Sequence, residues 1–303
     1  MTSEHAIVIE GFTRRFGRRI AVDDVSLQVP RGSIFGLLGR NGAGKSTTIR
    51  ALMNLISPSA GRMTLLGLDS VKDALRVRQR VAYVPEEPKY YDWMTVEEIL
   101  SFNASFYESW DADHAATLVK RLEVPRGRRL RELSLGTRAK VGLTMALGAR
   151  PELLILDDPT SGLDAVVRQE FLETIIANVQ AEGGTVFFSS HLIHEMERVA
   201  DRVAIMDRGR IVACAPLDRL KAETKKVRAV YPEAPPDRFT LPGLLRVERE
   251  PHQAVLTLSG CGPAMMQEVR GTGAEAVEVL DLSLEEIFIE TVKGGGSHVR
   301  DND

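Results

Sequence analysis

A glycine-rich stretch from Gly39 to Thr47 has the residue types and spacing of a site for phosphate groups. It reads Gly-Arg-Asn-Gly-Ala-Gly-Lys-Ser-Thr and fits the pattern G-x-x-x-x-G-K-[ST]. Glycines let backbone N–H groups converge on phosphate oxygens, because no Cβ stands in the way. Lys45 would reach the β- and γ-phosphates, and the Ser46 hydroxyl would hold Mg²⁺. We expect a nucleotide to contact Gly39, Arg40, Asn41, Gly42, Ala43, Gly44, Lys45, Ser46 and Thr47.

The elements on either side of this stretch are those that a phosphate-binding loop requires. Residues 33–38 form a short apolar run that is typical of a buried strand. After the loop, apolar residues recur at i, i+3, i+4 and i+7, which predicts a helix with one buried face; they are Ile49, Leu52, Met53 and Ile56. The positive end of that helix would point at the bound phosphates.

A second group of chemical residues follows a run of four aliphatic residues, Leu153-Leu154-Ile155-Leu156. Such a run is typical of a strand buried on both faces in a parallel sheet. Asp157 and Asp158 come at its carboxyl end, where open α/β sheets bind ligands. Beside a phosphate loop, we interpret Asp157 as the acid of the Mg²⁺ shell. Another buried strand, 185–190, ends at His191, which could contact the γ-phosphate.

Three weaker signals have an ordinary alternative each. Phe16, upstream of the phosphate loop, could stack on adenine or cap a small hydrophobic cluster. Glu86 lies in a stiff turn between Pro85 and Pro88 that could meet a metal or its water, or could be a solvated loop. Ser134 and Gly136 open a long helix, and they predict either a second anion site or an ordinary N-cap.

Composition limits the class of protein. The chain has 303 residues, of which 44% are hydrophobic, enough for about two domains with sizeable cores. No apolar run approaches the roughly 18 residues of a membrane-spanning helix, and the first ten residues do not have the pattern of a secretory signal. A net charge of −3 gives no overall attraction to nucleic acid. We interpret Cys214 and Cys261 as small apolar residues of a reduced cytoplasmic protein.

The pattern of elements predicts two regions. Two predicted helices interrupt the α/β pattern of the first region. One begins at Thr95, with a capping box to Glu98, and the other begins at Asp111. From about residue 224 the pattern changes to strands over 225–229, 245–250, 254–259 and 276–282, with helices over 263–270 and 283–292. We therefore predict a small accessory α+β domain over 224–293, followed by a disordered tail over 294–303.

The order of these motifs resembles the nucleotide-binding subunit of ATP-binding-cassette (ABC) transporters, over roughly residues 5–222. A shorter stretch, Leu284-Glu285-Glu286-Ile287-Phe288, is similar to the tail of bacterial ABC-2-type exporter subunits. The resemblance implies an α/β fold: a P-loop NTPase cassette over 1–223 with a parallel core sheet, an antiparallel N-terminal sheet and a helical subdomain at about 89–150.

The resemblance also assigns roles to residues. Phe16 would be the adenine-stacking aromatic, Glu86 would belong to the loop that senses Mg²⁺ and the membrane subunit, and His191 would be the switch histidine. Ser134 and Gly136 would form the signature that clamps the ATP of the opposite subunit, and Asp164 would lie in the loop that crosses the dimer interface. Catalysis would then involve Asp158, His191 and Glu86, and the metal would be held by Ser46, Glu86 and Asp157.

The sequence departs from the family pattern at three places. Leu135 and Thr137 replace a common Gly and Gln of the signature, although Ser134 and Gly136 remain. Glu86 stands where the family usually has Gln, and Asp158 stands where the catalytic base is usually Glu. The last change leaves open whether ATP hydrolysis is slow.

The resemblance implies an ATPase that uses ATP and Mg²⁺ and powers export through a separate integral membrane permease. Its partners would be that permease and a second ATP-binding subunit, identical or different, with no nucleic acid. It would lie in the cytoplasm, peripheral to the inner face of the cell membrane. The alternatives are a soluble ABC ATPase without a transport role, and a nucleotide-gated binding module with little hydrolysis.

Overall fold

The computed structural model describes residues 4–293 and 299–300, and their contacts divide the chain into two compact units. The N-terminal unit contains the residues up to His191 together with Arg208–Arg210. The C-terminal unit contains Leu192–Asp207 and the residues from Ile211 onward. Among the described residues, no helix is long and apolar enough to cross a membrane.

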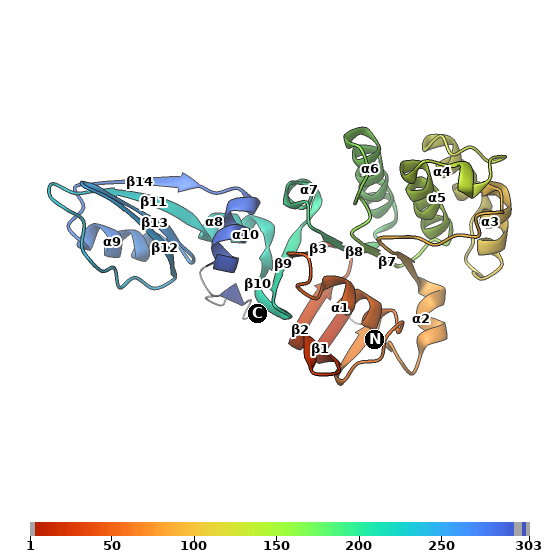
Figure 1. The fold of residues 1–303 in the computed structure, drawn as a ribbon, viewed down its shortest axis with the longest axis horizontal. Coiled ribbons are helices and arrows are strands. Elements are labelled where there is room, and N and C mark those ends of the chain that lie inside the picture. Colours follow the sequence, from red (N-terminus) through yellow and green to blue (C-terminus); the bar gives the residue numbers. More distant parts are fainter. Residues whose placement is uncertain (1–3, 294–298, 301–303) are drawn as a thin grey trace. The chain divides into compact units, whose positions relative to one another are not determined.

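An antiparallel sheet begins the N-terminal unit, with strand order β2-β1-β4-β5 (Figure 1). Its strands are β1 (His5–Phe16), β2 (Arg19–Pro30), β4 (Ala60–Leu65) and β5 (Leu68–Asp69). The predicted strands over 6–11 and 20–29 are confirmed in type but are longer in the structure. Pairing continues to Phe16 and Arg19 through charged residues, which no apolar alternation marks in the sequence.

The core of the N-terminal unit is a parallel sheet in the order β3-β8-β7-β6. It consists of β3 (Ile34–Gly39), β8 (Thr185–Ser190), β7 (Leu153–Asp157) and β6 (Val81–Val84). The first three are buried along their whole length, as their unbroken apolar runs predict. Because the strands are parallel, their carboxyl ends meet at one edge of the sheet. Helix α1 (Lys45–Leu52) begins at this edge and packs against both sheets.

Three further helices pack together as the predicted helical subdomain: α3 (Val96–Ala104), α4 (Ala112–Arg121) and α5 (Leu135–Gly148) (Figure 1). The other helical elements of this unit are α2 (Ala74–Arg80), the short η1 (Leu130–Glu132) and α6 (Ala165–Glu182). The capping box that opens α3 is confirmed, since the Thr95 hydroxyl and the Glu98 carboxylate cap each other's backbone N–H groups. The helix ends at Ala104, and Phe106, which lies beyond its last turn, is 56% exposed.

The C-terminal unit contains a second antiparallel sheet, in the order β12-β13-β11-β14. One of its faces packs on α9 around a core that includes Val227, Leu256 and Val269. The sheet and the helices predicted beyond residue 224 agree in type and order with the structure. The elements of this unit are α7 (Ile193–Val199), β9 (Arg202–Asp207), β10 (Arg210–Pro216), α8 (Leu217–Glu223), β11 (Lys225–Val230), β12 (Leu244–Glu250), β13 (Gln253–Leu258), α9 (Pro263–Gly271), β14 (Ala276–Asp281), α10 (Leu284–Lys293) and β15 (Val299–Arg300).

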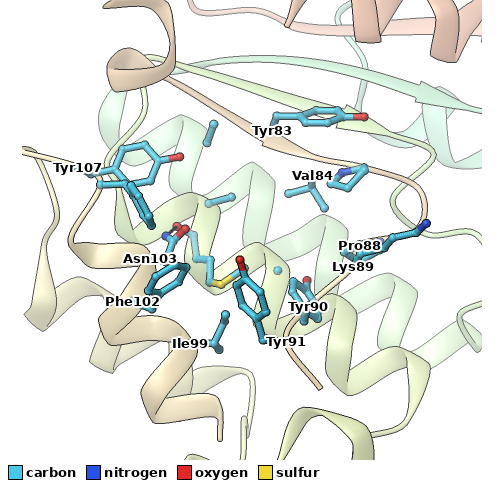
Figure 2. Close-up of a pocket in the computed structure, with 16 residues that line it drawn as sticks. Tyr83, Val84, Pro88, Lys89, Tyr90, Tyr91, Ile99, Phe102, Asn103 and Tyr107 are labelled. Atoms are coloured by element: carbon cyan, nitrogen blue, oxygen red, sulfur yellow. Dashed lines mark hydrogen bonds between the residues drawn. The ribbon is translucent and has the colours of Figure 1, made fainter. Parts of the chain in front are cut away.

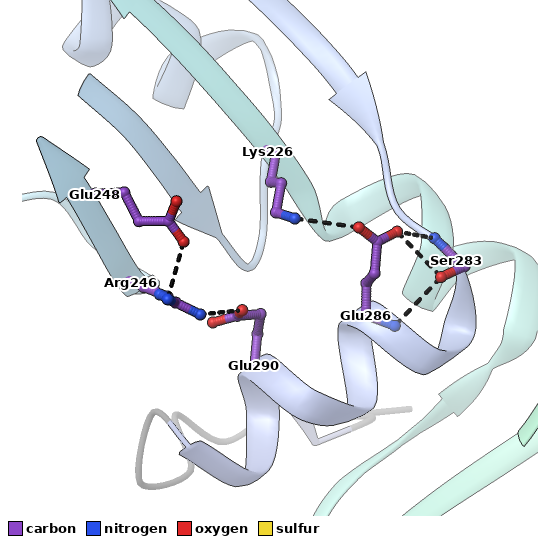
Figure 3. Close-up of polar contacts among 6 residues, drawn as sticks. All are labelled: Lys226, Arg246, Glu248, Ser283, Glu286 and Glu290. Atoms are coloured by element: carbon purple, nitrogen blue, oxygen red, sulfur yellow. Dashed lines mark hydrogen bonds and ion pairs between the residues drawn. The ribbon is translucent and has the colours of Figure 1, made fainter. Parts of the chain in front are cut away.

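Helix α10 is attached to this sheet by ion pairs, as Figure 3 shows. Lys226 Nζ lies 3.1 Å from Glu286 Oε1, and Arg246 Nη1 lies 2.9 Å from the buried Glu290 Oε1. Ser283 caps the helix, since its hydroxyl accepts from the Glu286 N–H at 3.3 Å. The same helix packs against α7, so the last helix of the chain ties the sheet to the segment that directly follows His191.

The predicted disordered tail, 294–303, lies outside the described residues except for Val299–Arg300. These two residues form β15 and pair in parallel with Ala213 and Cys214 of β10. Cys214 and Cys261 are both half-buried.

Candidate nucleotide-binding site

The phosphate-binding loop joins the end of β3 to the start of α1. Gly42 and Gly44 have φ angles of 81° and 113°, in the left-handed region that glycine adopts at no steric cost. The turn is closed by the Ala43 N–H, which donates to the Arg40 carbonyl at 3.0 Å. The buried Lys45 side chain folds back along the loop, and its ammonium donates to the Gly39 carbonyl at 2.6 Å. The loop therefore has a curved backbone, and the Lys45 ammonium group is held inside the curve.

A pocket of about 420 Å³ opens over this loop. Phe16 forms part of its wall and is 48% exposed, and the Arg14 guanidinium lies 4.5 Å from the centre of its ring. A side chain so exposed is not the cap of a hydrophobic cluster, which was the alternative for Phe16. Most of the predicted nucleotide contacts line this one cavity, whose walls are formed by Phe16, Arg19, Ala21, Asn41, Gly42, Gly44, Lys45, Ser46, Thr47, Glu86 and Asp158.

Asp157 connects the loop to the neighbouring strands. Its Oδ1 accepts from the hydroxyls of Ser46 and Ser189, each at 2.9 Å, and the residue is fully buried. Its Oδ2 is buried too and has no hydrogen-bond partner among the described residues. Burial raises the pKa of this carboxyl, because a charged carboxylate loses its hydration there. An unpartnered oxygen beside the Ser46 hydroxyl fits a cation such as Mg²⁺.

Asp158 and His191 form a second polar pair at the same edge of the sheet. His191 Nδ1 lies 2.5 Å from Asp158 Oδ2. The Asp158 N–H donates to the Ser189 hydroxyl at 3.0 Å, which fixes the backbone of the acid. Asp158 has a φ of 47°, in the left-handed region that Asp tolerates better than most residues. Its Oδ1 is buried and has no hydrogen-bond partner within the part of the chain that the structure describes.

The charged groups in and beside this pocket influence one another. Burial raises the pKa of Glu86, and the nearby Asp158 and Asp157 raise it further. Burial lowers the pKa of Lys45, against the opposing effect of the same three carboxylates. The described acidic, histidine and cysteine side chains form no closed cage of three or more metal ligands. A magnesium ion bound with a nucleotide needs only one or two protein groups, because phosphates and water complete its shell.

Ser134, Gly136 and Asp164 lie together but are not among the residues that line the pocket. Ser134 is the N-cap of α5, where its hydroxyl accepts from the Thr137 N–H at 3.2 Å. Asp164 Oδ1 accepts from the N–H groups of Val166 and Val167 at the start of α6, each at 3.0 Å. A Cβ added to Gly136 would lie 3.2 Å from a methyl group of Val167. The starts of α5 and α6 therefore form one surface, separate from the pocket of the same chain.

Sequence reasoning missed three residues of the site. Ser189 binds both Asp157 and the backbone of Asp158, and Arg19 lines the pocket. Tyr83 is close enough to Asp157 to be affected by its charge, and burial raises the pKa of its phenol to about 12. A signal was available for Ser189, because a hydroxyl residue at the end of a buried strand, two positions before His191, faces the same edge of the sheet.

Comparisons with known proteins establish the family. Residues 22–161 match the family model described as ABC transporter. The ABC transporter ATP-binding protein YtrB of Bacillus subtilis (strain 168) is 33% identical over 208 residues, which cover 69% of this chain and 71% of that protein. The chain belongs to the ABC transporter family. The bacitracin transport ATP-binding protein BcrA of Bacillus licheniformis is 35% identical over 217 residues, 71% of each chain.

The fold of this ABC protein agrees with solved structures. An ATP-binding subunit of an ABC transporter, 28% identical, superposes with a TM-score of 0.67 over 72% of this chain and 92% of that one. The predicted family and the predicted α/β cassette fold are thus confirmed. The chain is the ATP-binding, P-loop ATPase subunit of an ABC transporter.

Proposed function

We propose that this ABC subunit hydrolyses Mg²⁺-ATP and powers export through a separate permease. The observation that carries the proposal is the 2.9 Å contact between Ser46 and Asp157, which joins the phosphate loop to the acidic end of β7. Next to it, the Asp158–His191 pair supplies an acid and a base at the edge of the same sheet. Phosphate cradle, metal ligands and a water-orienting group are the parts that phosphoryl transfer requires.

Each residue of the pocket has a role in this proposal. Phe16 stacks on adenine, the loop backbone holds the phosphates, and Lys45 turns from the Gly39 carbonyl to the β- and γ-phosphates. When bound, Mg²⁺ neutralises charge on the phosphates, and Ser46 and Asp157 would hold it, with Glu86 contributing to its shell. Asp158 orients the attacking water and accepts its proton, and His191 holds that water and the γ-phosphate in place.

Hydrolysis by this site is slow but real in our proposal. Asp is one methylene shorter than the Glu that is usual at position 158, which withdraws the carboxylate by roughly 1 Å, and a misplacement of that size can cost about a hundredfold in rate. The contact with His191 holds the Asp158 carboxylate, and the bonds from the Asp158 N–H to Ser189 fix its backbone, which limits the loss.

A second ATP-binding subunit completes the site. Ser134, Gly136 and Asp164 lie on a surface apart from the pocket, so in our proposal they act on the ATP of the opposite subunit. Two ATP molecules would be held between the phosphate loop of one subunit and the α5 start of the other. The partner would be a second copy or a related chain, and a second copy is the case that purified protein can test.

A groove beside Glu86 is the contact that we propose for the permease. It has a volume of about 230 Å³ and is lined mainly by side chains of the loop after β6 and of α3 and α5. Figure 2 shows Tyr91 and Phe102 on its wall, and their ring centres are 5.7 Å apart. Tyr91 is 52% exposed, which suits a protein contact. The subunit would then lie at the inner face of the cell membrane, bound to its permease.

Export is supported by two observations. The segment from Leu284 to Phe288, which resembles the tail of ABC-2-type exporter subunits, lies within the anchored helix α10. A similar protein of Streptomyces coeruleorubidus, 34% identical over 227 residues, is the daunorubicin resistance ATP-binding protein DrrA3. The Asp158 substitution favours one further candidate, a nucleotide-gated module with little hydrolysis, and measured turnover separates it from the exporter ATPase.

The direct test is phosphate release from Mg²⁺-ATP by purified protein. We expect Lys45→Ala to abolish turnover and tight ATP binding, because it removes the cation of the loop, and to leave the fold intact. Lys72→Ala, which changes an exposed lysine far from the pocket, is the control and should behave as wild type. A folded Lys45→Ala protein with unaltered ATP affinity and turnover would refute the proposal.

A further inference from the structure

A cluster of arginines and one tryptophan lies on the surface of the helical subdomain, outside the nucleotide pocket and outside the groove. Its members are Trp93, Arg126, Arg128, Arg129 and Arg131, which we call the basic–aromatic patch. All five are exposed, Trp93 by 62%. None of them lines the pocket or the groove.

Two segments far apart in sequence form the patch by pairing side by side. Thr95 and Arg129 form an antiparallel bridge, the Leu130 N–H donates to the Met94 carbonyl at 2.9 Å, and the Arg131 N–H donates to the Asp92 carbonyl at 3.2 Å. Beyond this bridge, Leu130–Glu132 form the short helix η1. Leu130 is fully buried, whereas Arg129 and Arg131 on either side of it are exposed, as is Trp93.

The arginines of the patch keep their charge available to a partner. Arg126, Arg128 and Arg131 form no ion pair with any residue that the structure describes. Two nearby acids are already engaged: Asp92 pairs with Arg138 at 2.8 Å, and Glu98 accepts from the Thr95 N–H at 2.7 Å. Residues 126–132 contain four arginines and one acid, Glu132. Glu97 and Glu98 lie beside them, since the Glu97 N–H donates to the Arg126 carbonyl at 3.1 Å and Glu98 is close enough to Arg129 to interact with its charge. The four arginines exceed these three acids by one charge, on a chain whose net charge is −3.

We propose that the basic–aromatic patch binds the anionic phospholipid headgroups of a membrane surface. Clustered arginines are attracted to the negative potential of such a surface, and an exposed tryptophan places its amphipathic ring at the level of the headgroups. An acidic protein segment is the competing partner, but no pocket that would receive its side chains is lined by the patch.

The proposal goes beyond the permease contact, because it requires no permease. The experiment therefore uses the purified full chain with vesicles of phosphatidylcholine alone, or with about 30% phosphatidylglycerol, to set the surface charge. We expect binding to the anionic vesicles only, weakened by added salt because the charges are screened. The chain has two tryptophans, so a Trp110→Phe protein reports on Trp93 alone, and its emission should shift to the blue on binding.

Charge reversal tests whether the patch itself is responsible. Each arginine near an anionic surface contributes about fivefold in affinity, so Arg128→Glu with Arg131→Glu should weaken vesicle binding at least about tenfold. Lys72→Glu with Arg78→Glu, which reverses two exposed charges near and on α2, is the matched control and should bind nearly as wild type. If the reversed protein is poorly folded, Arg128→Ala with Arg131→Ala replaces it.

Three results would overturn the proposal. They are equal binding to neutral and anionic vesicles, equal loss in the patch and control proteins, and binding of soluble poly-L-glutamate as tight as that of anionic vesicles. The last result would assign the patch to an acidic protein segment instead. Lys45→Ala should bind vesicles as wild type does, so failure of the ATPase proposal and failure of the lipid proposal are told apart.

Discussion

The Asp158 carboxylate is held from two directions, by its contact with His191 and by the bonds of its backbone to Ser189. Asp158 has a left-handed φ of 47° directly after β7, and it lines the pocket over the phosphate loop. This backbone conformation and the shorter side chain of Asp occur at the same residue. We therefore interpret Asp158 as part of a site in which the backbone conformation compensates for the shorter side chain and positions the carboxylate.

Substitutions of Asp158 test whether it orients the attacking water. Asp158→Asn should lower turnover at least about a hundredfold, because the amide cannot accept the proton, and should leave an ATP-bound protein. Asp158→Glu should match or exceed wild type in turnover, at a cost of about 1 kcal/mol in stability, since Glu tolerates a left-handed φ less well. Initial rates of phosphate release and thermal melting measure both effects. Turnover of the Asn protein at the wild-type rate would show that Asp158 is not the base.

The raised pKa of Asp157 gives the protein a pH-dependent response to Mg²⁺. Without metal, the folded carboxyl holds its proton more tightly than the unfolded one, so its contribution to stability is present at low pH and is lost as the pH rises through the raised pKa. Bound Mg²⁺ requires the charged form. We therefore expect the rise in melting temperature with Mg²⁺ and nucleotide to become smaller as the pH falls through the raised pKa of Asp157, and Asp157→Asn to lose this pH dependence. A rise that does not change with pH in wild type would contradict the assignment.

At the scale of elements, the starts of α5 and α6 are built as one surface. Ser134 and Asp164 cap the two helices, and Gly136 lies against Val167. Capping explains why a serine and an aspartate stand at these positions. It does not explain a glycine within the first turn of α5, where the helix would be stabler with alanine. A close approach by the ATP of another subunit would account for it.

Gly136 allows this idea to be tested with a matched pair of substitutions. Gly136→Asp should abolish turnover by steric and charge repulsion of a γ-phosphate, while ATP still binds to the phosphate loop of the same chain. Gly136→Ala adds the same Cβ without the charge and should lower turnover less than Gly136→Asp does, because the methyl groups of Val167 need to give by only a few tenths of an ångström and no charge is brought to the phosphate. ATP binding by titration and phosphate release are measured on both. Normal turnover in Gly136→Asp would exclude the clamp.

Most elements could be predicted because their periodicity or their capping residues are local. The four aliphatic residues before Asp157, the Thr95–Glu98 capping box and the strands of the accessory region are examples. The ends of elements were harder to predict. Phe106 repeats the spacing of α3, but the helix ends at Ala104, and the charged ends of β1 and β2 are strand only because they pair. Ser189 was missed because its role arises from strands that are neighbours in space and not in sequence.

At the scale of the whole molecule, the contacts divide the chain at His191 and assign Leu192–Asp207 to the C-terminal unit. The sequence could not indicate this division, because it depends on the packing of α7 against α10, which are about ninety residues apart. The proposed boundary near residue 224 coincides with a different feature, the start of the second antiparallel sheet at Lys225. Our proposal remains that residues 224–293 are an accessory domain.

Removal of the chain after Glu223 tests that proposal. ATP binding should be retained, because no residue of the nucleotide pocket lies beyond this point. Stability should fall, since α7 would lose the apolar face of α10 that covers it. Titration with ATP and urea unfolding measure the two effects. Complete loss of soluble protein would indicate that the accessory region belongs to the core of the fold.

The central claim is that ATP binds to the phosphate loop and is clamped by a second subunit. Sedimentation velocity of purified Asp158→Asn protein, with and without saturating Mg²⁺-ATP, tests it most directly, because slow hydrolysis preserves the bound state. We predict a monomer without nucleotide and a dimer with two bound ATP molecules when it is present. The same protein carrying Lys45→Ala should remain monomeric under both conditions. An Asp158→Asn protein that binds ATP and stays monomeric would contradict the account.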